Sequence, residues 1–117
     1  MRLAEIAKAL VLEKLTPGRE VSEDVDVTAG YSSDLLSDVL AHAPSGGVLV
    51  TIHTHMNVLA VALHASLTAV VFAANRRPDE AVIRRAVDDG IQLYGTRLSA
   101  FDVVGRLYQV GLRGPAQ

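Results

Sequence analysis

The strongest constraint on the fold of this chain is the regular alternation of short apolar runs with helical patterns. The runs at 48–52 and 68–73 are continuous and rich in β-branched residues, which is typical of strands buried on both faces of a sheet. Residues 25–29 alternate between apolar and polar, and 91–94 form a short fourth run. The runs start about 20–23 residues apart, and a helical pattern follows each one. This order predicts parallel strands joined by right-handed helical crossovers.

Helix start and stop signals support the same order. Ser33 is the expected N-cap of a helix that Asp34 opens, because a carboxylate suits the positive end of the helix dipole. Pro78, followed by two acids, predicts the start of another helix, which Gly90 ends. The first and last helices are predicted at 2–10 and 98–109, and the last is expected to turn four side chains inward: Phe101, Val104, Leu107 and Tyr108.

The helix predicted to start near Asn57 differs from the others, because residues 58–65 are apolar nearly all round, except His64. A helix of this kind is buried on more than one side. In a chain of 117 residues, the second side is expected to meet a partner subunit. Asn57 itself has two open interpretations, as the N-cap of this helix or as a ligand-binding side chain.

The predicted fold is therefore α/β and three-layered. We expect a mainly parallel four-stranded sheet with helices on both faces, plus an N-terminal helix. The length of 117 residues fits one domain, which we assign to residues 1–113, with 114–117 as a flexible tail. Half of the residues are hydrophobic and 21% are charged, which is enough apolar material for a packed core.

Charge and composition argue against several classes of protein. The net charge is −2, whereas a general nucleic-acid binder is usually basic, so no nucleic-acid partner is expected. The absence of cysteine excludes disulfides and thiolate chemistry and fits a reducing cytoplasm. Glu5 and Lys8 interrupt the N-terminal apolar stretch, so it is not a secretory signal. No apolar run is long enough to span a bilayer, and we expect a cytoplasmic protein with no membrane partner.

Polar residues concentrate in the four loops that follow the predicted strands. Ligands of open parallel sheets bind at the carboxyl ends of the strands, where helix N-termini offer N–H groups to anions. Three arginines in these loops could add positive charge, while Thr51 and Asn57 would orient the ligand. The predicted ligand-binding residues are Ser33, Asp34, Thr51, His53, His55, Asn57, Asn75, Arg76, Arg77, Thr96 and Arg97.

The triplet at 53–55 suggests a different chemistry. At a two-residue spacing, His53 and His55 could face the same side and bind a metal with Asp34 as a third ligand. The alternative is that both are polar loop histidines. Asp34 and Asp38 lie four residues apart, so they could act as an acid–base pair or lie on a solvated helix face.

Motifs for nucleotide-dependent catalysis are absent. The chain contains no G-x-x-x-x-G-K-[ST], no G-x-G-x-x-G and no G-x-S-x-G. We therefore assign no catalytic residue and no cofactor, and we do not expect a self-sufficient enzyme.

Three stretches carry a resemblance to a known family: GYSSDLLSDVLA (30–41), TIHTHMNVLAVA (51–62) and RPDEAVIRRAVDDGIQLYGTRLSAFDVVGRLY (77–108). Together they resemble the DRTGG-domain family over roughly residues 2–110, and SDLLSD at 33–38 is the most specific segment. The match is to small stand-alone members, some of which are encoded near iron-hydrogenase genes. The family's naming motif is absent, because residues 53–57 read HTHMN.

The resemblance implies an α/β fold similar to the N-terminal domain of HPr kinase/phosphorylase. It also implies a regulatory or dimerising module, since relatives occur beside CBS domains in regulated pyrophosphatases and at the front of phosphotransacetylases. No catalytic residue is established for the domain, so none is carried over.

Three functions follow as hypotheses. The leading one is a non-catalytic regulatory domain, acting as a homodimer. It would sense a small anionic ligand, such as a nucleotide or phosphorylated metabolite, or dock a partner enzyme such as a hydrogenase-related protein. The second is a metal-dependent hydrolase or transferase that uses His53, His55 and Asp34. The third is a purely structural dimerisation module with the helix at 58–65 as its interface.

Overall fold

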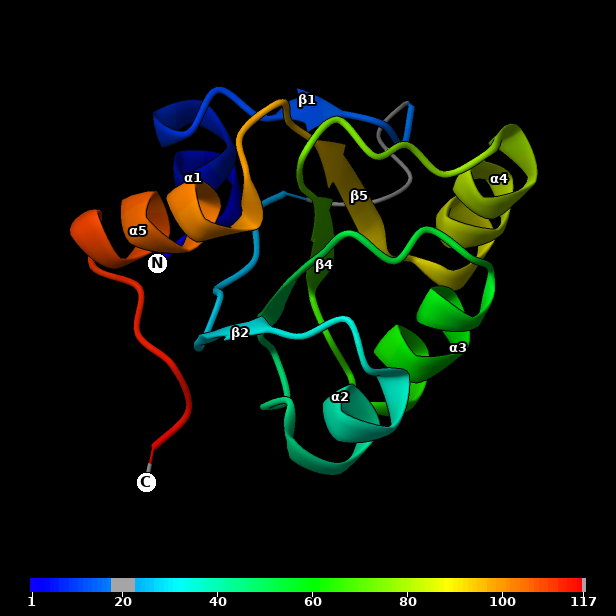
Figure 1. Ribbon diagram of the computed structural model, residues 1–117, viewed down its shortest axis with the longest axis horizontal. Helices are drawn as coiled ribbons and strands as arrows, with labels where there is room; N and C mark the ends of the chain where they lie inside the picture. The colour runs from blue at the N-terminus through cyan, green and yellow to red at the C-terminus, as the bar shows by residue number, and fades with distance from the viewer. Residues whose placement is uncertain (18–22, 117) are drawn as a thin grey trace.

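The computed structural model describes residues 1–17 and 23–116, and within these ranges the chain forms a five-stranded sheet between two layers of helices (Figure 1). The strands are β1 (Glu13–Lys14), β2 (Gly30–Ser32), β3 (Val48–Thr51), β4 (Ala69–Phe72) and β5 (Gln92–Gly95). The helices are α1 (Leu3–Ala9), α2 (Leu36–His42), α3 (Asn57–His64), α4 (Glu80–Asp89) and α5 (Ala100–Gln109).

The sheet has the order β1-β5-β4-β3-β2. The pairs β2–β3, β3–β4 and β4–β5 are parallel, and β1 runs antiparallel to β5. The predicted mainly parallel α/β sheet is therefore confirmed in outline, but the prediction of four strands is wrong. The missed strand, β1, has only two residues and both are exposed, so no hydrophobic alternation marks it in the sequence.

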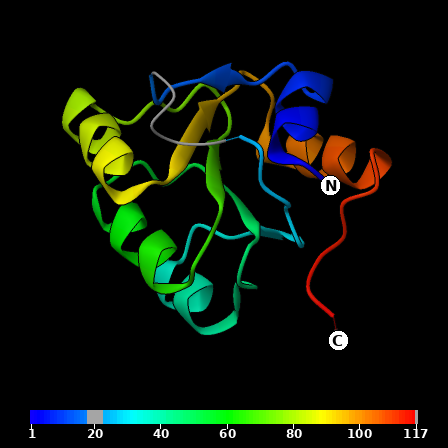
Figure 2. The same ribbon diagram turned by 180° about the vertical axis from the view of Figure 1, so that it is seen from behind.

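Two hydrophobic cores lie on opposite faces of the sheet. Successive side chains of a strand point to opposite faces, so Val50 and Val71 join one core while Leu49 and Val70 join the other. Helices α1 and α5 cover the first face, and α2, α3 and α4 cover the second (Figures 1 and 2). This arrangement confirms the expected helices on both faces.

The strand predicted at 25–29 lies elsewhere in the chain. The strand that pairs with β3 is Gly30–Ser32, directly after the predicted segment. Residues 25–27 instead run beside the N-terminus: the Leu3 amide donates to the Val25 carbonyl at 2.9 Å, and the Val27 amide donates to the Met1 carbonyl at 2.7 Å. The alternating pattern therefore reflects packing against α1, which buries Val27 without placing it in the sheet.

The predicted start of α2 is wrong, whereas the predicted start of α3 near Asn57 is confirmed, although Asn57 is not its N-cap. Helix α2 begins at Leu36 with Leu35 as its N-cap, so neither Ser33 nor Asp34 lies in its first turn. Helix α3 begins at Asn57 itself, with Met56 in the N-cap position. In the loop before α2, Ser33 and Asp34 bond to neighbouring loop and strand groups, and in the loop before α3 the side chain that accepts from a first-turn amide is that of His55.

Helix α4 follows its sequence signals closely. The Asp79 side chain accepts a hydrogen bond from the Val82 amide at 3.1 Å, which is the expected N-cap geometry. Gly90 ends the helix in the left-handed conformation, with φ of 72°. Such a C-cap favours glycine because it has no Cβ to clash.

Helix α5 is turned differently from the prediction. It buries Val103 and Leu107, whereas Phe101, Val104 and Tyr108 are exposed. The prediction of four inward side chains is therefore correct only for Leu107. The N-terminus lies beside the end of this helix, where a Cβ at Gly111 would be 3.6 Å from the Met1 side chain (Figure 2).

The last residues run along the outer edge of the sheet. The Gly30 amide at the start of β2 donates to the Arg113 carbonyl at 2.8 Å. The flexible tail predicted at 114–117 stays a prediction, and its last residue, Gln117, lies outside the described residues. Among the residues described, no helix is long and apolar enough to cross a membrane.

Candidate functional site

The predicted ligand-binding residues divide into two groups along the carboxyl edge of the sheet. The first, which we name the histidine cluster, follows β2 and β3 and consists of Ser33, Asp34, Thr51, His53, His55 and Asn57. The second follows β4 and β5 and borders a cavity of about 570 Å³, which we name the arginine groove. Its lining residues are Leu10, Val11, Glu13, Asn75, Arg77, Gly95, Thr96, Arg97, Leu98 and Arg106.

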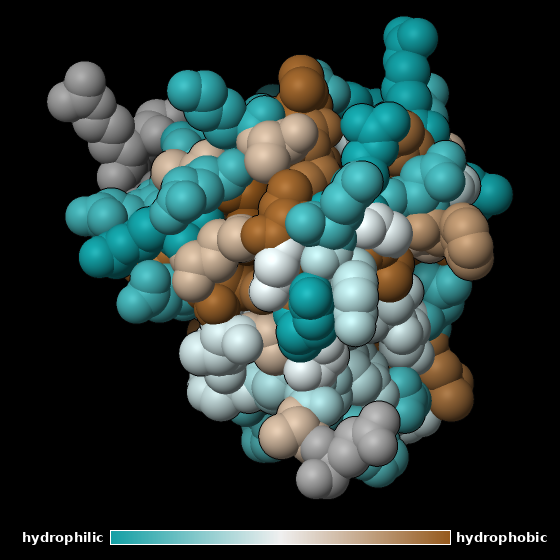
Figure 3. Space-filling view, turned by 90° about the vertical axis from the view of Figure 1, so that its left-hand side faces the viewer, coloured by the Kyte–Doolittle hydropathy of each residue, from teal (hydrophilic) through white to brown (hydrophobic). Residues whose placement is uncertain are grey.

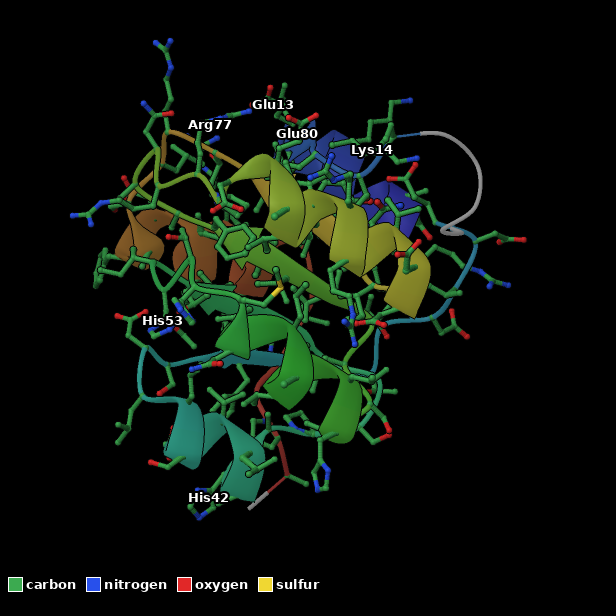
Figure 4. The ribbon with its side chains drawn as sticks, turned by 90° about the vertical axis from the view of Figure 1, so that its right-hand side faces the viewer. Glu13, Lys14, His42, His53, Arg77 and Glu80 are labelled. Atoms are coloured by element: carbon green, nitrogen blue, oxygen red, sulfur yellow. The ribbon has the colours of Figure 1, made fainter. Side chains whose placement is uncertain are left out.

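No side-chain hydrogen bond or ion pair joins the two groups within residues 1–17 and 23–116. Figure 4 shows Arg77 next to Glu13, with His53 well apart from this pair on the same side of the view. Arg76 is exposed in the loop after β4 and is not part of the groove lining. The residues predicted as a single site therefore form two separate groups, the histidine cluster and the arginine groove.

Asp34 organises the histidine cluster. Its Oδ1 accepts hydrogen bonds from the Thr51 hydroxyl at 2.7 Å and from the Ile52 amide at 2.9 Å. The Thr51 Oγ1 in turn accepts from the His53 amide at 3.1 Å. Thr51 is fully buried, so its hydroxyl needs such a partner. Asp34 thus fastens the loop after β2 to the end of β3.

The two histidines of the cluster have different roles. The Nδ1 of His55 accepts from the Asn57 amide at 3.2 Å and so caps the start of α3. The ring of His53 lies edge-on to that of His55, with centroids 6.4 Å apart. The Nε2 of His53 is buried and has no hydrogen-bond partner among the described residues.

The predicted metal donors do not form a set. Across 1–17 and 23–116, no three or more His, Asp or Glu side chains are placed to share a metal ion. The loop bends at residues 52 and 55, and the two imidazoles lie next to one another, edge-on, without a third donor beside them among the described residues. Asp34 already accepts two hydrogen bonds from the protein.

Asp34 and Asp38, considered as an acid–base pair, have separate partners. Asp38 accepts from the Tyr31 hydroxyl at 2.8 Å and lies 3.2 Å from Nδ1 of His42. The hydrogen bond from Tyr31, with smaller contributions from Ser33 and His42, lowers the pKa of the Asp38 carboxyl. The same bond raises the pKa of the Tyr31 phenol. These groups link β2 to α2, and their pKa shifts come from this structural linkage.

The arginine groove is built on strained backbone. Ala74 and Asn75 both have φ of 57°, and Val11 on the facing wall has φ of 52°. Such left-handed conformations cost residues such as Ala74 and Val11 about 1–2 kcal/mol each, whereas asparagine adopts them more readily, and they persist where surrounding bonds enforce them. The enforcing bonds join the two loops: the Ala74 amide donates to the Leu98 carbonyl at 2.7 Å, and the Asn75 amide donates to the Thr96 carbonyl at 2.8 Å.

Glu13 is the acidic group of the groove. Both of its carboxylate oxygens accept from the guanidinium of Arg77, with Nη2 and Oε1 3.2 Å apart (Figure 4). This hydrogen bonding lowers the pKa of Glu13 and raises the pKa of Arg77. Both side chains are about half exposed, so the pair contributes little to stability. Its main effect is to orient the Arg77 guanidinium along the groove wall.

Arg97 and Arg106 are the unpaired cations of the groove. Neither side chain has a hydrogen-bond or ion-pair partner in the part of the chain that the structure describes. Arg77 is balanced by Glu13, so the groove retains the positive charge of two guanidinium groups. This is an arrangement that attracts an anion.

The helix N-termini contribute less than the sequence suggests. The side chains of His55, Asp79 and Ser99 accept hydrogen bonds from amides in the first turns of α3, α4 and α5. An imidazole, a carboxylate and a hydroxyl thus each occupy one of the N–H groups that an anion could use. The arginine side chains of the groove are therefore the more accessible donors at this edge.

Sequence reasoning found four lining residues of the groove, namely Asn75, Arg77, Thr96 and Arg97, and missed two charged residues of the same lining. Glu13 lies in the two-residue strand β1, and Arg106 lies on the final helix. Neither belongs to a loop after a parallel strand, so the rule that located the other residues could not find them.

No protein-family model and no curated protein matches the chain. Among solved structures, the chain is similar to the regulatory region of Clostridium perfringens pyrophosphatase, which consists of CBS and DRTGG domains and was crystallised with its activator, diadenosine tetraphosphate. The TM-score is 0.74 at 13% identity, and the match covers 92% of this chain and 46% of that one. The chain thus spans about half of that structure, and the likeness shows a DRTGG-like fold at a coarse level.

Proposed function

We propose that this chain is a non-catalytic regulatory domain that binds a small anionic ligand, a nucleotide or a phosphorylated metabolite, in the arginine groove. The observation that carries the proposal is a cavity of about 570 Å³ with two guanidinium groups that have no partner among the described residues. Cavities of roughly 300–1,000 Å³ are typical of small-molecule sites. The groove also lies at the edge where open parallel sheets bind their ligands.

The groove residues can divide the recognition of a phosphate between them. Arg97 offers a planar fork of donors that matches phosphate oxygens. The Thr96 Oγ1 accepts from the Leu98 amide at 3.2 Å, so its own proton is directed away from that amide and is available to an anion. Arg77 can turn from Glu13 toward the ligand, and Asn75 adds a neutral amide. Charge and hydrogen-bond donation together favour phosphate over neutral ligands.

The fold comparison supports the regulatory part of this proposal. The similar structure is a regulatory region, and its activator is a nucleotide with four phosphates. We propose that the chain is a stand-alone DRTGG-like domain, which acts in the cytoplasm as a homodimer. We also propose that it transmits ligand binding to a partner enzyme, such as a hydrogenase-related protein.

The test is a calorimetric titration of the protein with pyrophosphate, ATP and diadenosine tetraphosphate at low salt. The proposal predicts saturable binding of at least one of them and a loss of about tenfold or more in the Arg97→Ala variant. Arg84→Ala is the matched control, because Arg84 is an exposed arginine of α4 outside the groove. Failure of all three ligands to bind, or equal losses in the two variants, would contradict the proposal.

A further inference from the structure

Helix α5 presents an apolar stripe to solvent. Phe101, Val104 and Tyr108 are 87%, 41% and 58% exposed, and their spacing of three and four residues puts them on one side of the helix. Figure 3 faces the side of the molecule that carries α1 and α5, and it shows apolar side chains gathered among polar ones. Large exposed apolar residues in such a stripe are typical of a contact surface rather than of a solvated helix.

A glycine lies at the centre of this stripe. Gly105 follows Phe101 by four residues, and a Cβ at this position would meet nothing within 4 Å. Glycine weakens a helix interior relative to alanine, and the fold of the single chain gives no steric reason for it. Absence of a side chain does allow a second helix to approach closely, because the distance between packed helices is set by the side chains at the contact.

Two opposite charges flank the stripe on one side. Asp102 and Arg106 are four residues apart, yet neither side chain has an ion-pair partner in the described parts of the chain. The stripe therefore has an acid toward its start and a base toward its end. Reversing the direction of the helix exchanges the two charges.

We propose that the occupant of this surface is a second copy of the chain, with the two α5 helices packed antiparallel about a twofold axis between Val104 and Gly105. In a twofold interface, the contact of one residue with another is repeated in reverse. Such an axis places Phe101 against Tyr108 of the second copy and Val104 against its Gly105. It also brings Asp102 of each copy toward Arg106 of the other, so that in the dimer Arg97 is the groove cation that keeps its charge free for an anion. Size and charge are thus complementary to the same surface reversed.

Tyr108, at the C-terminal end of the stripe, is already held in place by Arg113. The Arg113 guanidinium lies 3.7 Å from the centroid of the Tyr108 ring, and it donates to the Tyr108 carbonyl at 2.7 Å. This contact restricts the ring before any partner binds, which reduces the entropy lost on association.

The interface is small, which has a consequence for its strength. Stable protein interfaces bury about 800 Å² on each partner, and one helix of ten residues supplies only part of that area. Val11, 85% exposed, borders the arginine groove together with Arg106 and extends the apolar surface beyond α5. We expect a reversible dimer whose population changes with protein concentration in the micromolar range.

Sedimentation equilibrium of the full chain over about 1–300 µM tests the proposal. The wild type is expected to shift from monomer to dimer, and Phe101→Asp is expected to stay monomeric. Leu63→Asp is the control, because Leu63 is an exposed apolar residue on α3, on the opposite face of the sheet. A wild type that is monomeric throughout, or a dimer that only Leu63→Asp dissociates, overturns the proposal.

A charge exchange tests the antiparallel arrangement itself. Asp102→Arg and Arg106→Asp each put like charges opposite one another and should weaken the dimer at least fivefold, whereas the double variant should restore it. Gly105→Gln should raise the thermal midpoint of the monomer and weaken the dimer, because it improves helix propensity and blocks close approach. Absence of rescue by the double variant, or an unchanged dimer in Gly105→Gln, contradicts this geometry.

The dimer and the anion site can fail separately. Phe101→Asp changes no lining residue of the arginine groove, and as a monomer it leaves Arg106 free of Asp102 of the other copy, so its affinity for pyrophosphate should be at least that of the wild type. This interface rests on the homodimer of the proposed function, so a monomeric wild type that binds pyrophosphate overturns the dimer in both proposals and leaves the anion site standing. A dimer that binds none of the anions overturns the anion site and leaves the interface standing.

Discussion

The histidine cluster and the arginine groove occupy the same edge of one sheet but use their polar groups in opposite ways. In the cluster, Asp34 and His55 bond to hydroxyl and amide groups of the protein itself. In the groove, Arg97 and Arg106 have no partner in the parts of the chain that are described. The comparison teaches that a polar loop at the carboxyl edge of a sheet is not by itself a binding site. What matters is whether the protein has already satisfied its donors and acceptors.

The largest effect is expected from removing Asp34, which organises the histidine cluster. Asp34→Ala removes the acceptor of both the Thr51 hydroxyl and the Ile52 amide. The variant leaves the buried Thr51 hydroxyl without its carboxylate acceptor. We therefore expect the free energy of unfolding, measured by urea denaturation, to fall by about 2 kcal/mol. Asp88→Ala is the control, since Asp88 is exposed on α4. If Asp34→Ala instead weakened anion binding and left stability intact, the two regions would have been assigned the wrong roles.

The second prediction concerns the strained backbone of the groove. Ala74→Gly relieves a left-handed alanine, and should stabilise the protein by about 0.5 kcal/mol after the entropy cost of glycine. Gly90→Ala makes the reverse change at φ of 72° with no steric neighbour, and should destabilise by about 1 kcal/mol. Thermal unfolding of both variants compares them directly. Destabilisation by Ala74→Gly would show that this backbone is not strained.

The third prediction uses the pH dependence of the groove. The hydrogen bond from Arg77 holds the pKa of Glu13 below 4.5, so Glu13 stays charged and competes with an added anion at neutral pH. Glu13→Gln should therefore raise the affinity for sulfate about threefold at pH 7. In the wild type, affinity should rise toward the variant's value only as the pH falls below 4.5.

The effect of the same pair on stability has a defined sign. Because the folded-state pKa is lowered, the contribution of Glu13 to stability is present above pH 4.5 and is lost as the pH falls through the folded-state value.

The control for the sulfate experiment is Glu80→Gln, at an exposed acid at the start of α4, which should leave sulfate binding unchanged. An unaltered sulfate affinity in Glu13→Gln would show that Arg77 takes no part in binding.

The smallest effect is expected from changing His53 in the histidine cluster. The Nε2 of His53 is buried without a partner in the described residues, and an unsatisfied polar atom costs folding free energy. His53→Leu should therefore change the free energy of unfolding by no more than about 0.5 kcal/mol. A loss several times larger in urea denaturation would show that this nitrogen has a stabilising partner in solution.

The sequence was sufficient for the features that depend on local patterns. The runs at 48–52 and 68–73 predicted β3 and β4 because strands buried on both faces must be apolar throughout. Proline, acids and a terminal glycine predicted α4 because these residues satisfy its ends. The four loops of the candidate site followed from the order of the strands.

Features that depend on contacts between distant segments were not predictable in this way. Residues 25–27 have a strand pattern but bond to the N-terminus, and the two residues of β1 have no pattern at all. The apolar residues of α5 could have been inward or outward, and only the packing of Val103 and Leu107 decides which face is buried. For the same reason, the sequence identified the loops, but it could not show which of their polar side chains are already hydrogen-bonded within the protein.

The most direct test of this contrast is an amide chemical-shift titration of the protein with pyrophosphate. We expect the perturbed amides to belong to Asn75, Arg77, Thr96 and Arg97, with little change at residues 53–57. Perturbations confined to 53–57, or none at saturating pyrophosphate, would contradict it.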